Sequence, residues 1–387
     1  MAWMMKQSIM LLKRSMNIDL FGKIGMDKGQ RKSNIELLRI FVTCFVIVLH
    51  YNNSSLGGAL AETPYRSSQY MVLLLLEAVA ICAVDVFVVI SGYFLSKSNE
   101  RYLGRGFVLI LHVIFFNVID YLITIVFGNR GFNVKSFLLR LVPSNWFVVI
   151  YIAMYYISPL LNLAFNNIPL EKNKRQNGII SVNKTILLLG LILLFCVWPS
   201  FVDIMYDLTG YNFIGLSTIG AFDSGKGYTI TNFVVCYLVG NYISFIENEI
   251  IIKRKHLFII FLICVGVLFC LMYYEISVAY YYYNPIIVLN SAILFIIFLK
   301  TKINNKIINK MINKLSSCTM TVYLIHISVL PYLGISSYAN RNVLIMMFHI
   351  MLCIVIIFLI GFVSDRIYKL LMKKPNSMLV KIVGYRV

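Results

Sequence analysis

Charged residues are scarce in this chain of 387 residues: Asp, Glu, Lys and Arg make up only 13% of it, whereas a soluble domain has about 25%. Hydrophobic residues make up 60%, and the mean hydropathy is +0.81. A soluble enzyme is excluded, because no globule of this size has enough interior to bury so many apolar side chains. Intrinsic disorder is excluded too, since it requires low hydrophobicity. A polytopic membrane protein is what remains.

Acidic residues and paired cysteines are also few. There are 35 Lys and Arg against 16 Asp and Glu, which gives a formal charge of +19. In a soluble chain such a charge would suggest nucleic acid binding. The eight cysteines form no CxxC pair and nearly all lie inside apolar runs, which is typical of small buried hydrophobic residues. We therefore expect neither disulfides nor a metal centre.

The apolar runs predict an all-α protein with about ten transmembrane helices, since a span needs about 20 mostly apolar residues. The loops are short, and no repeat or soluble domain stands out. We expect a cytoplasmic segment at 1–32, one transmembrane domain at 33–366 and a cytoplasmic tail at 367–387. The predicted spans are about 36–52, 71–94, 106–127, 146–165, 184–202, 229–247, 256–274, 280–299, 319–335 and 343–364.

The positions of the positive charges indicate the topology. If the N-terminus lies inside, 28 Lys and Arg residues fall on inner segments and 6 on outer segments, while Arg39 lies within the first span. This asymmetry follows the positive-inside rule and places both termini in the cytoplasm. The basic charge thus reports topology and contact with membrane lipids, and we expect no nucleic acid partner.

Two polar residues of the first predicted span are functional candidates, because a charged group at mid-membrane costs about 2.5–3.5 kcal/mol on insertion scales. Arg39 and His50 are eleven residues apart. That spacing is close to three helical turns and a rise of about 16 Å, so both side chains leave one face of the helix. Arg39 then lies toward the cytoplasm and His50 near the outer surface. Alternatively, Arg39 snorkels to lipid headgroups and His50 merely ends the helix.

Further candidates lie on and after the second span. Asp85 is the one acid in an apolar stretch, and we expect it to pair with Arg39, as a structural contact or in catalysis. Ser91, which precedes a glycine, fits close approach of a ligand or of a packed helix. Arg101 and Arg105 follow on the cytoplasmic side, where they suit a phosphate-rich ligand or anionic lipid.

Aromatic and histidine side chains mark two later spans. Trp146 and Tyr151 occupy the outer end of the fourth span, which suits an aromatic belt or stacking on sugar rings. His326 lies one turn from Tyr323 in the ninth span. A lone intramembrane histidine is more often a packing or hydrogen-bonding residue than a catalyst.

Four motifs in order resemble the acyltransferase-3 family, integral membrane acyltransferases that O-acetylate bacterial surface glycans. They are Arg39-x10-His50, Val86 to Phe94 around Ser91-Gly92-Tyr93, Trp146 to Asn162, and Ser317 to His326. The resemblance covers residues 33 to 364 and includes the count of ten spans. Two departures stand out. Ser144-Asn145 replaces a His-Leu that many members have before Trp-Phe, and the arginine-rich stretch after the second span is reduced to Arg101 and Arg105, without its proline.

The resemblance implies transfer of acetyl from cytoplasmic acetyl-CoA to a hydroxyl of a surface polysaccharide outside the bacterial cytoplasmic membrane. His50 would be the general base, because its unperturbed pKa of about 6.5 lies near operating pH. The other implied roles are catalysis for Arg39 and Asp85, contact with CoA for Arg39, Ser91, Arg101 and Arg105, and contact with the acceptor for Trp146, Tyr151 and His326. A proton-relay role for His326 and an acyl-His50 intermediate are further options.

Two alternatives to acetyl transfer stay open. A succinyl-transferring relative fits the same residues. A polysaccharide exporter or flippase also fits ten helices with intramembrane charge. Transporters often carry inverted repeats whose helices are broken by Gly or Pro at mid-membrane. No such pair is visible here, because the internal prolines lie near the predicted ends of spans.

Overall fold

Apolar runs in a bilayer fold into helices, because a helix satisfies its backbone hydrogen bonds internally. The structure is a computed structural model that describes residues 32–98, 101–127, 131–170, 183–211, 216–219 and 225–382. Within these ranges, nine helices are long and apolar enough to cross a membrane. One further pair of helices passes the same test together but is bent by 52°. The all-α architecture with about ten spans is thereby confirmed.

The spans follow the chain in the predicted order. They are α2 (Ser33–Asn52), α4 with α5 (Ser68–Ala80 and Ala83–Leu95), α6 (Leu103–Phe127), α8 (Trp146–Asn166), α9 with α10 (Lys184–Ile192 and Trp198–Thr209), α11 (Ile230–Ile246), α12 (Arg254–Tyr273), α13 (Pro285–Leu299), the bent pair α14 and α15 (Lys306–Ser316 and Thr319–Val329), and α17 (Val343–Leu371). Short helices connect or extend them: α3 (Ala59–Glu62), α7 (Val134–Arg140), α16 (Ile335–Ala339) and α18 (Lys373–Ile382).

Several helix ends are set by local sequence. The Asn145 side chain accepts a hydrogen bond from the Val148 backbone N–H and so begins α8. Asn284 caps α13 in the same way, with Pro285 as its first residue, where the missing N–H costs nothing. Gly210 ends α10 in the left-handed conformation that glycine adopts readily.

Two spans contain prolines in their interior, so the prediction that the internal prolines lie near span ends is wrong for them. Pro159 lies inside α8. Pro199 lies in the first turn of α10, directly after a π-helical turn, Leu193–Val197, that joins α9 to α10 in the span Lys184–Thr209. The extra residue of a π-turn shifts the hydrogen-bond register, so the chain accommodates this proline without ending the span.

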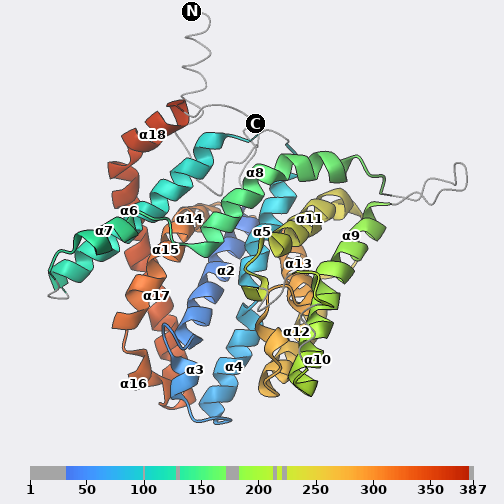
Figure 1. Ribbon diagram of the computed structural model, residues 1–387, viewed down its shortest axis with the longest axis horizontal. Helices are drawn as coiled ribbons and strands as arrows, with labels where there is room; N and C mark the ends of the chain where they lie inside the picture. Colours follow the sequence, from blue (N-terminus) through green and yellow to red (C-terminus); the bar gives the residue numbers. More distant parts are fainter. Residues whose placement is uncertain are drawn as a thin grey trace, which may run out of the picture.

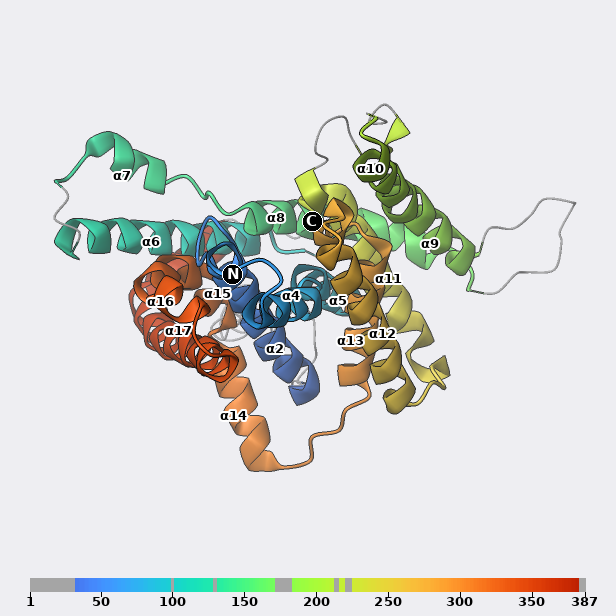
Figure 2. The same ribbon diagram turned by 90° about the horizontal axis from the view of Figure 1, so that it is seen from below.

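Helix α2 lies at the centre of the bundle. It packs against α4, α5, α13, α14, α15 and α17. Figure 2 shows α2, α4 and α5 between a group containing α6, α15 and α17 and a group containing α9 to α13. In Figure 1, α2 runs from beside α14, in the middle of the picture, down toward α3 and α16. We call these the Arg39 side and the His50 side of the bundle.

The polarity of the bundle is that of a membrane protein. Large apolar side chains are exposed on its periphery, for example Leu344 at 78% and Phe348 at 71% on α17. Charged and polar groups lie inside instead: Arg39, Asp85 and Arg101 are all buried. In a bilayer this arrangement faces lipid with hydrocarbon and confines the costly groups to the interior.

The closest helix contact explains the glycine after Ser91. Of the described elements, α5 and α11 pack most extensively. A Cβ atom at Gly92 would overlap the Tyr237 carbonyl, and one at Gly240 would overlap the Val89 carbonyl. Small residues on both helices therefore let the two backbones approach, and Gly92 serves packing, the second of its two predicted explanations.

Candidate active site

Helix α2 carries Arg39 and His50 on one continuous helix, as predicted. The helix extends unbroken from Ser33 to Asn52. Arg39 is 6% exposed, whereas His50 is half-buried. The eleven intervening residues separate their backbones by about 16 Å, so the two side chains belong to opposite sides of the bundle.

The His50 imidazole has one nitrogen engaged and one available. Its Nδ1 lies 2.8 Å from the Val46 carbonyl oxygen. A carbonyl only accepts, so Nδ1 carries the proton and Nε2 keeps its lone pair in the neutral ring. Within the described part of the chain, Nε2 has no hydrogen-bond partner. In this tautomer Nε2 can accept a proton.

His326 lies directly beside His50. Its ring centroid is 4.6 Å from that of His50, and the two rings meet edge to face. His326 is fully buried, and neither of its nitrogens makes a hydrogen bond of normal geometry to a described residue, although the backbone carbonyls of Val322 and Tyr323 lie near the ring. An unsatisfied buried polar group costs about 1–3 kcal/mol. The first and ninth predicted spans thus supply a pair of adjacent imidazoles.

Arg39 and Asp85 do not form the expected pair. The Arg39 guanidinium forms an ion pair with Glu36, one turn earlier on α2, at 2.9 Å. Asp85 instead accepts a hydrogen bond of 2.9 Å from Asn232 on α11. The expected pair has a physical reason to fail. Spacing along one helix shows that Glu36 is within reach of Arg39, but the residue that faces Asp85 depends on how the helices are rotated against each other. Asp85 lies in the first turn of α5, where the helix dipole favours a carboxylate.

Ser91 and Tyr151 lie together near Arg39. The Ser91 hydroxyl on α5 lies 3.2 Å from the Tyr151 hydroxyl on α8, and both residues are buried. The Tyr151 hydroxyl lies within electrostatic range of the guanidinium groups of Arg39 and Arg101. These two predicted site residues therefore lie together, on the Arg39 side of the bundle.

Arg101 is held by the protein itself. It is 1% exposed. Its Nη1 and Nη2 donate to the carbonyl oxygens of Ser98 and Leu95 at 2.6 and 3.0 Å, and its Nε donates to Ser158 Oγ at 2.7 Å. These bonds satisfy carbonyls at the end of α5, so in this structure Arg101 orders that helix end. Arg105 is half-buried and stacks on the Tyr102 ring at 4.9 Å.

Aromatic rings form a continuous row from Trp146 to the imidazole pair. Trp146 is 37% exposed at the start of α8 and contacts Tyr228 at 4.3 Å and Tyr282 at 6.1 Å between centroids. The row continues inward through Phe147, Tyr323 and His326 to His50, with successive centroids 6.0, 5.3, 5.7 and 4.6 Å apart. Tyr228 and Tyr282 are not predicted from the sequence, because no motif or span pattern connects them to Trp146.

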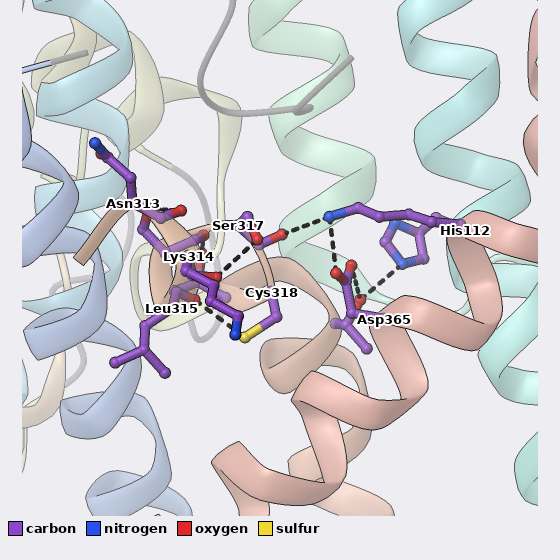
Figure 3. A network of polar contacts seen from close by, with 11 residues as sticks. His112, Asn313, Lys314, Leu315, Ser317, Cys318 and Asp365 are labelled. Atoms are coloured by element: carbon purple, nitrogen blue, oxygen red, sulfur yellow. Dashed lines mark hydrogen bonds and ion pairs between the residues drawn. The ribbon is translucent and has the colours of Figure 1, made fainter. Parts of the chain in front are cut away.

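A second network of buried polar groups was also missed. His112 Nε2 on α6 lies 3.2 Å from Thr321 Oγ1 on α15, and Thr321 donates to Asp365 on α17 at 3.2 Å. Lys369 pairs with Asp365 at 2.7 Å and donates to the Ser317 carbonyl at 3.1 Å, at the bend before α15 (Figure 3). The one signal in the sequence was Asp365, an acid at the end of the last apolar run. The network fixes the first turn of the helix that carries His326.

Comparison with known proteins identifies the kind of chain this is. A model of the acyltransferase-3 family, described as an acyltransferase domain, matches residues 32–364. No curated protein and no solved structure matches the chain. The matched region contains α2 with Arg39 and His50, α8 with Trp146 and Tyr151, and α15 with His326.

Proposed function

The chain belongs to this family of acyltransferases, and we propose that it transfers acetyl from cytoplasmic acetyl-CoA to a hydroxyl of a bacterial cell-surface polysaccharide across the cytoplasmic membrane. The observation that carries the proposal is the imidazole pair. His50 keeps one nitrogen available as a base beside a buried His326 with no hydrogen bonds to the described residues. Structural histidines normally have partners when buried.

The proposed orientation places the Arg39 side in the cytoplasm. The positive-inside rule supports it, since 28 of the 35 Lys and Arg residues fall on the segments that the sequence predicts to lie inside together with the N-terminus. Arg39 would then face the donor, where its fixed charge suits the phosphate groups of CoA, so that the thioester at the other end of the donor can extend toward His50. His50, about 16 Å further along α2, would face the acceptor.

The chemistry at His50 is general base catalysis. As the acceptor hydroxyl oxygen bonds to the acyl carbon, His50 Nε2 takes the hydroxyl proton, the carbon–sulfur bond breaks, and the proton passes to the CoA sulfur. His326, in contact with His50, can hold the proton between these steps. The aromatic row ending at Trp146 suits stacking on sugar rings of the acceptor. Such a base contributes about 10²–10⁴-fold to the rate.

The test compares O-acetyl content of purified surface polysaccharide from cells with wild type, His50→Ala or no protein. Acetyl present only with wild type supports the proposal. His256→Ala is a matched control, because His256 is exposed at the start of α12 and distant in sequence from every motif. Membrane levels of all variants are compared by immunoblot.

A second arm identifies the donor. Membranes containing each variant are supplied with radiolabelled acetyl-CoA or succinyl-CoA, and label in polysaccharide is counted. If only succinyl-CoA transfers label, the proposed acyl group is succinyl and not acetyl. Equal polysaccharide acylation with and without the protein would contradict the enzyme proposal and favour the export alternative, for which the amount of surface polysaccharide is the readout.

A further inference from the structure

We propose that His349 on α17 is a positioning residue that fixes the separation of His50 and His326. The inference rests on the proposed function, in which these two imidazoles act together. Its basis is a chain of two hydrogen bonds that begins at Tyr51, next to His50, and ends at Leu333, just beyond the helix of His326.

Every donor and acceptor in this chain can be assigned. His349 Nε2 lies 2.9 Å from the Leu333 carbonyl oxygen, which only accepts, so Nε2 carries the proton. In the neutral ring Nδ1 is therefore an acceptor, and the Tyr51 hydroxyl donates to it at 3.0 Å. Tyr51 is 0% and His349 5% exposed. The imidazole thus accepts a hydrogen bond at Nδ1 and donates one at Nε2.

These two hydrogen bonds link the two helices that carry His50 and His326. Tyr51 follows His50 on α2. Leu333 follows the single turn Leu330–Tyr332 that continues α15 without a break, and the Leu330 N–H donates to the His326 carbonyl. His349 thus bridges the His50 end of α2 and the end of α15 from a third helix.

The His349 ring is itself held in place. Tyr338 on α16 stacks on it in parallel, with centroids 4.1 Å apart and planes 8° from each other. Cys353, one turn along α17, contacts its edge through sulfur at 3.6 Å from Nε2. The ring therefore has little freedom to reorient, as a fixed link between two helices requires.

The imidazole pair needs such a link because it has few bonds of its own. His326 makes no hydrogen bond to any described residue, so the position of α15 sets the position of its ring. The His112, Thr321 and Asp365 network fixes the beginning of α15, and His349 fixes the chain just beyond its end. A displacement of about 1 Å between reacting groups can cost about 10²-fold in rate.

The kinetic test supplies the purified protein with acetyl-CoA and purified surface polysaccharide, and it measures kcat and KM. We expect Tyr51→Phe and His349→Leu each to lower kcat about tenfold or more, with KM for acetyl-CoA unchanged, and the double variant to be no worse than the poorer single one. His349→Gln should recover most of the loss, because its amide also offers a donor and an acceptor. Tyr242→Phe is the matched control, since this hydroxyl joins α11 to Thr185 on α9. Unchanged kcat in Tyr51→Phe, or losses that multiply in the double variant, would overturn the inference.

A second readout requires no acyl transfer. Cysteines at both positions (His50→Cys with His326→Cys) are joined by a short thiol-specific cross-linker and the linked peptides are quantified by mass spectrometry. Adding Tyr51→Phe should lower the yield, whereas adding Tyr242→Phe should not. An unchanged yield contradicts the inference whatever the activity. If wild type transfers no acyl group, the proposed function fails and the yield alone decides the role of His349.

Discussion

The two sides of α2 differ in how fully their buried polar groups are satisfied. On the Arg39 side, Arg39 pairs with Glu36, and Arg101 donates from Nε, Nη1 and Nη2 to protein oxygens. On the His50 side, His50 Nε2 and both nitrogens of His326 have no partner in the part of the chain that the structure describes. The guanidinium groups on the Arg39 side thus have acceptors within the protein, while the imidazoles on the His50 side keep nitrogens without a partner.

This difference separates architecture from chemistry. A compensated buried charge stabilises the fold only while its partner stays, and removing one partner is strongly destabilising. An uncompensated imidazole costs stability and is retained for what it does. Substitutions on the Arg39 side should therefore lower stability, whether or not they lower activity. Substitutions in the imidazole pair should lower activity alone.

The largest effect is expected at Arg39, because this residue both stabilises the fold and faces the acyl donor. Arg39→Met leaves the buried Glu36 carboxylate without its partner, which costs about 3–5 kcal/mol of stability, and acyl transfer should fall at least about 100-fold as the donor loses its cation. The double variant Arg39→Met/Glu36→Met should regain most of the thermal stability, since apolar replacement of a buried pair is often neutral, but none of the activity. Melting in detergent and acyl transfer are the measurements.

The same position distinguishes charge from geometry. If Arg39 acts mainly through its charge, Arg39→Lys should retain far more activity than Arg39→Ala. Equal losses would indicate that bidentate guanidinium geometry is required. Full activity in the Met/Met double variant would contradict a role in transfer and reduce Arg39 to a structural residue.

A smaller effect, on activity alone, is expected at His326. His326→Leu should lower kcat about ten- to 100-fold, because the relay beside His50 is lost. Its melting temperature should stay the same or rise, since no hydrogen bond is broken and a buried polar ring is replaced by an apolar side chain. Wild-type turnover in this variant, or a clear drop in melting temperature, would contradict the separation of the two sides.

The sequence predicts well whatever is encoded along one helix. The spans are recognisable as runs of about 20 apolar residues, and Arg39 and His50 share α2 because eleven residues are near three turns. Contacts between helices cannot be predicted in this way. The partner of Asp85 is Asn232, 147 positions away, and no periodicity specifies which helix faces which. His326 was visible as a motif residue, but its contact with His50 was not.

Interruptions of helices were equally hidden. The break between α4 and α5 falls at Ile81 and Cys82, and the 52° bend before α15 falls at Ser317 and Cys318. Neither contains glycine or proline, the residues that signal breaks in a sequence. At the second, Lys369 from α17 donates to the Ser317 carbonyl, a tertiary contact that local sequence does not reveal.

The smallest effect is expected at Ser158, which tests whether bonds on the Arg39 side stabilise without contributing to transfer. Its Oγ accepts from Arg101 Nε at 2.7 Å and donates to the Tyr155 carbonyl at 2.7 Å. Ser158→Ala removes a hydrogen bond to a charged group, worth about 1.5–3 kcal/mol, so the melting temperature should fall by a few degrees while kcat stays within about twofold. Ser200→Ala is the matched control, because that buried hydroxyl has no partner among the described residues and should cost almost nothing. If Ser158→Ala lowers kcat while leaving the melting temperature unchanged, Arg101 belongs to the transfer site, and satisfied bonds no longer distinguish architecture from chemistry in this bundle.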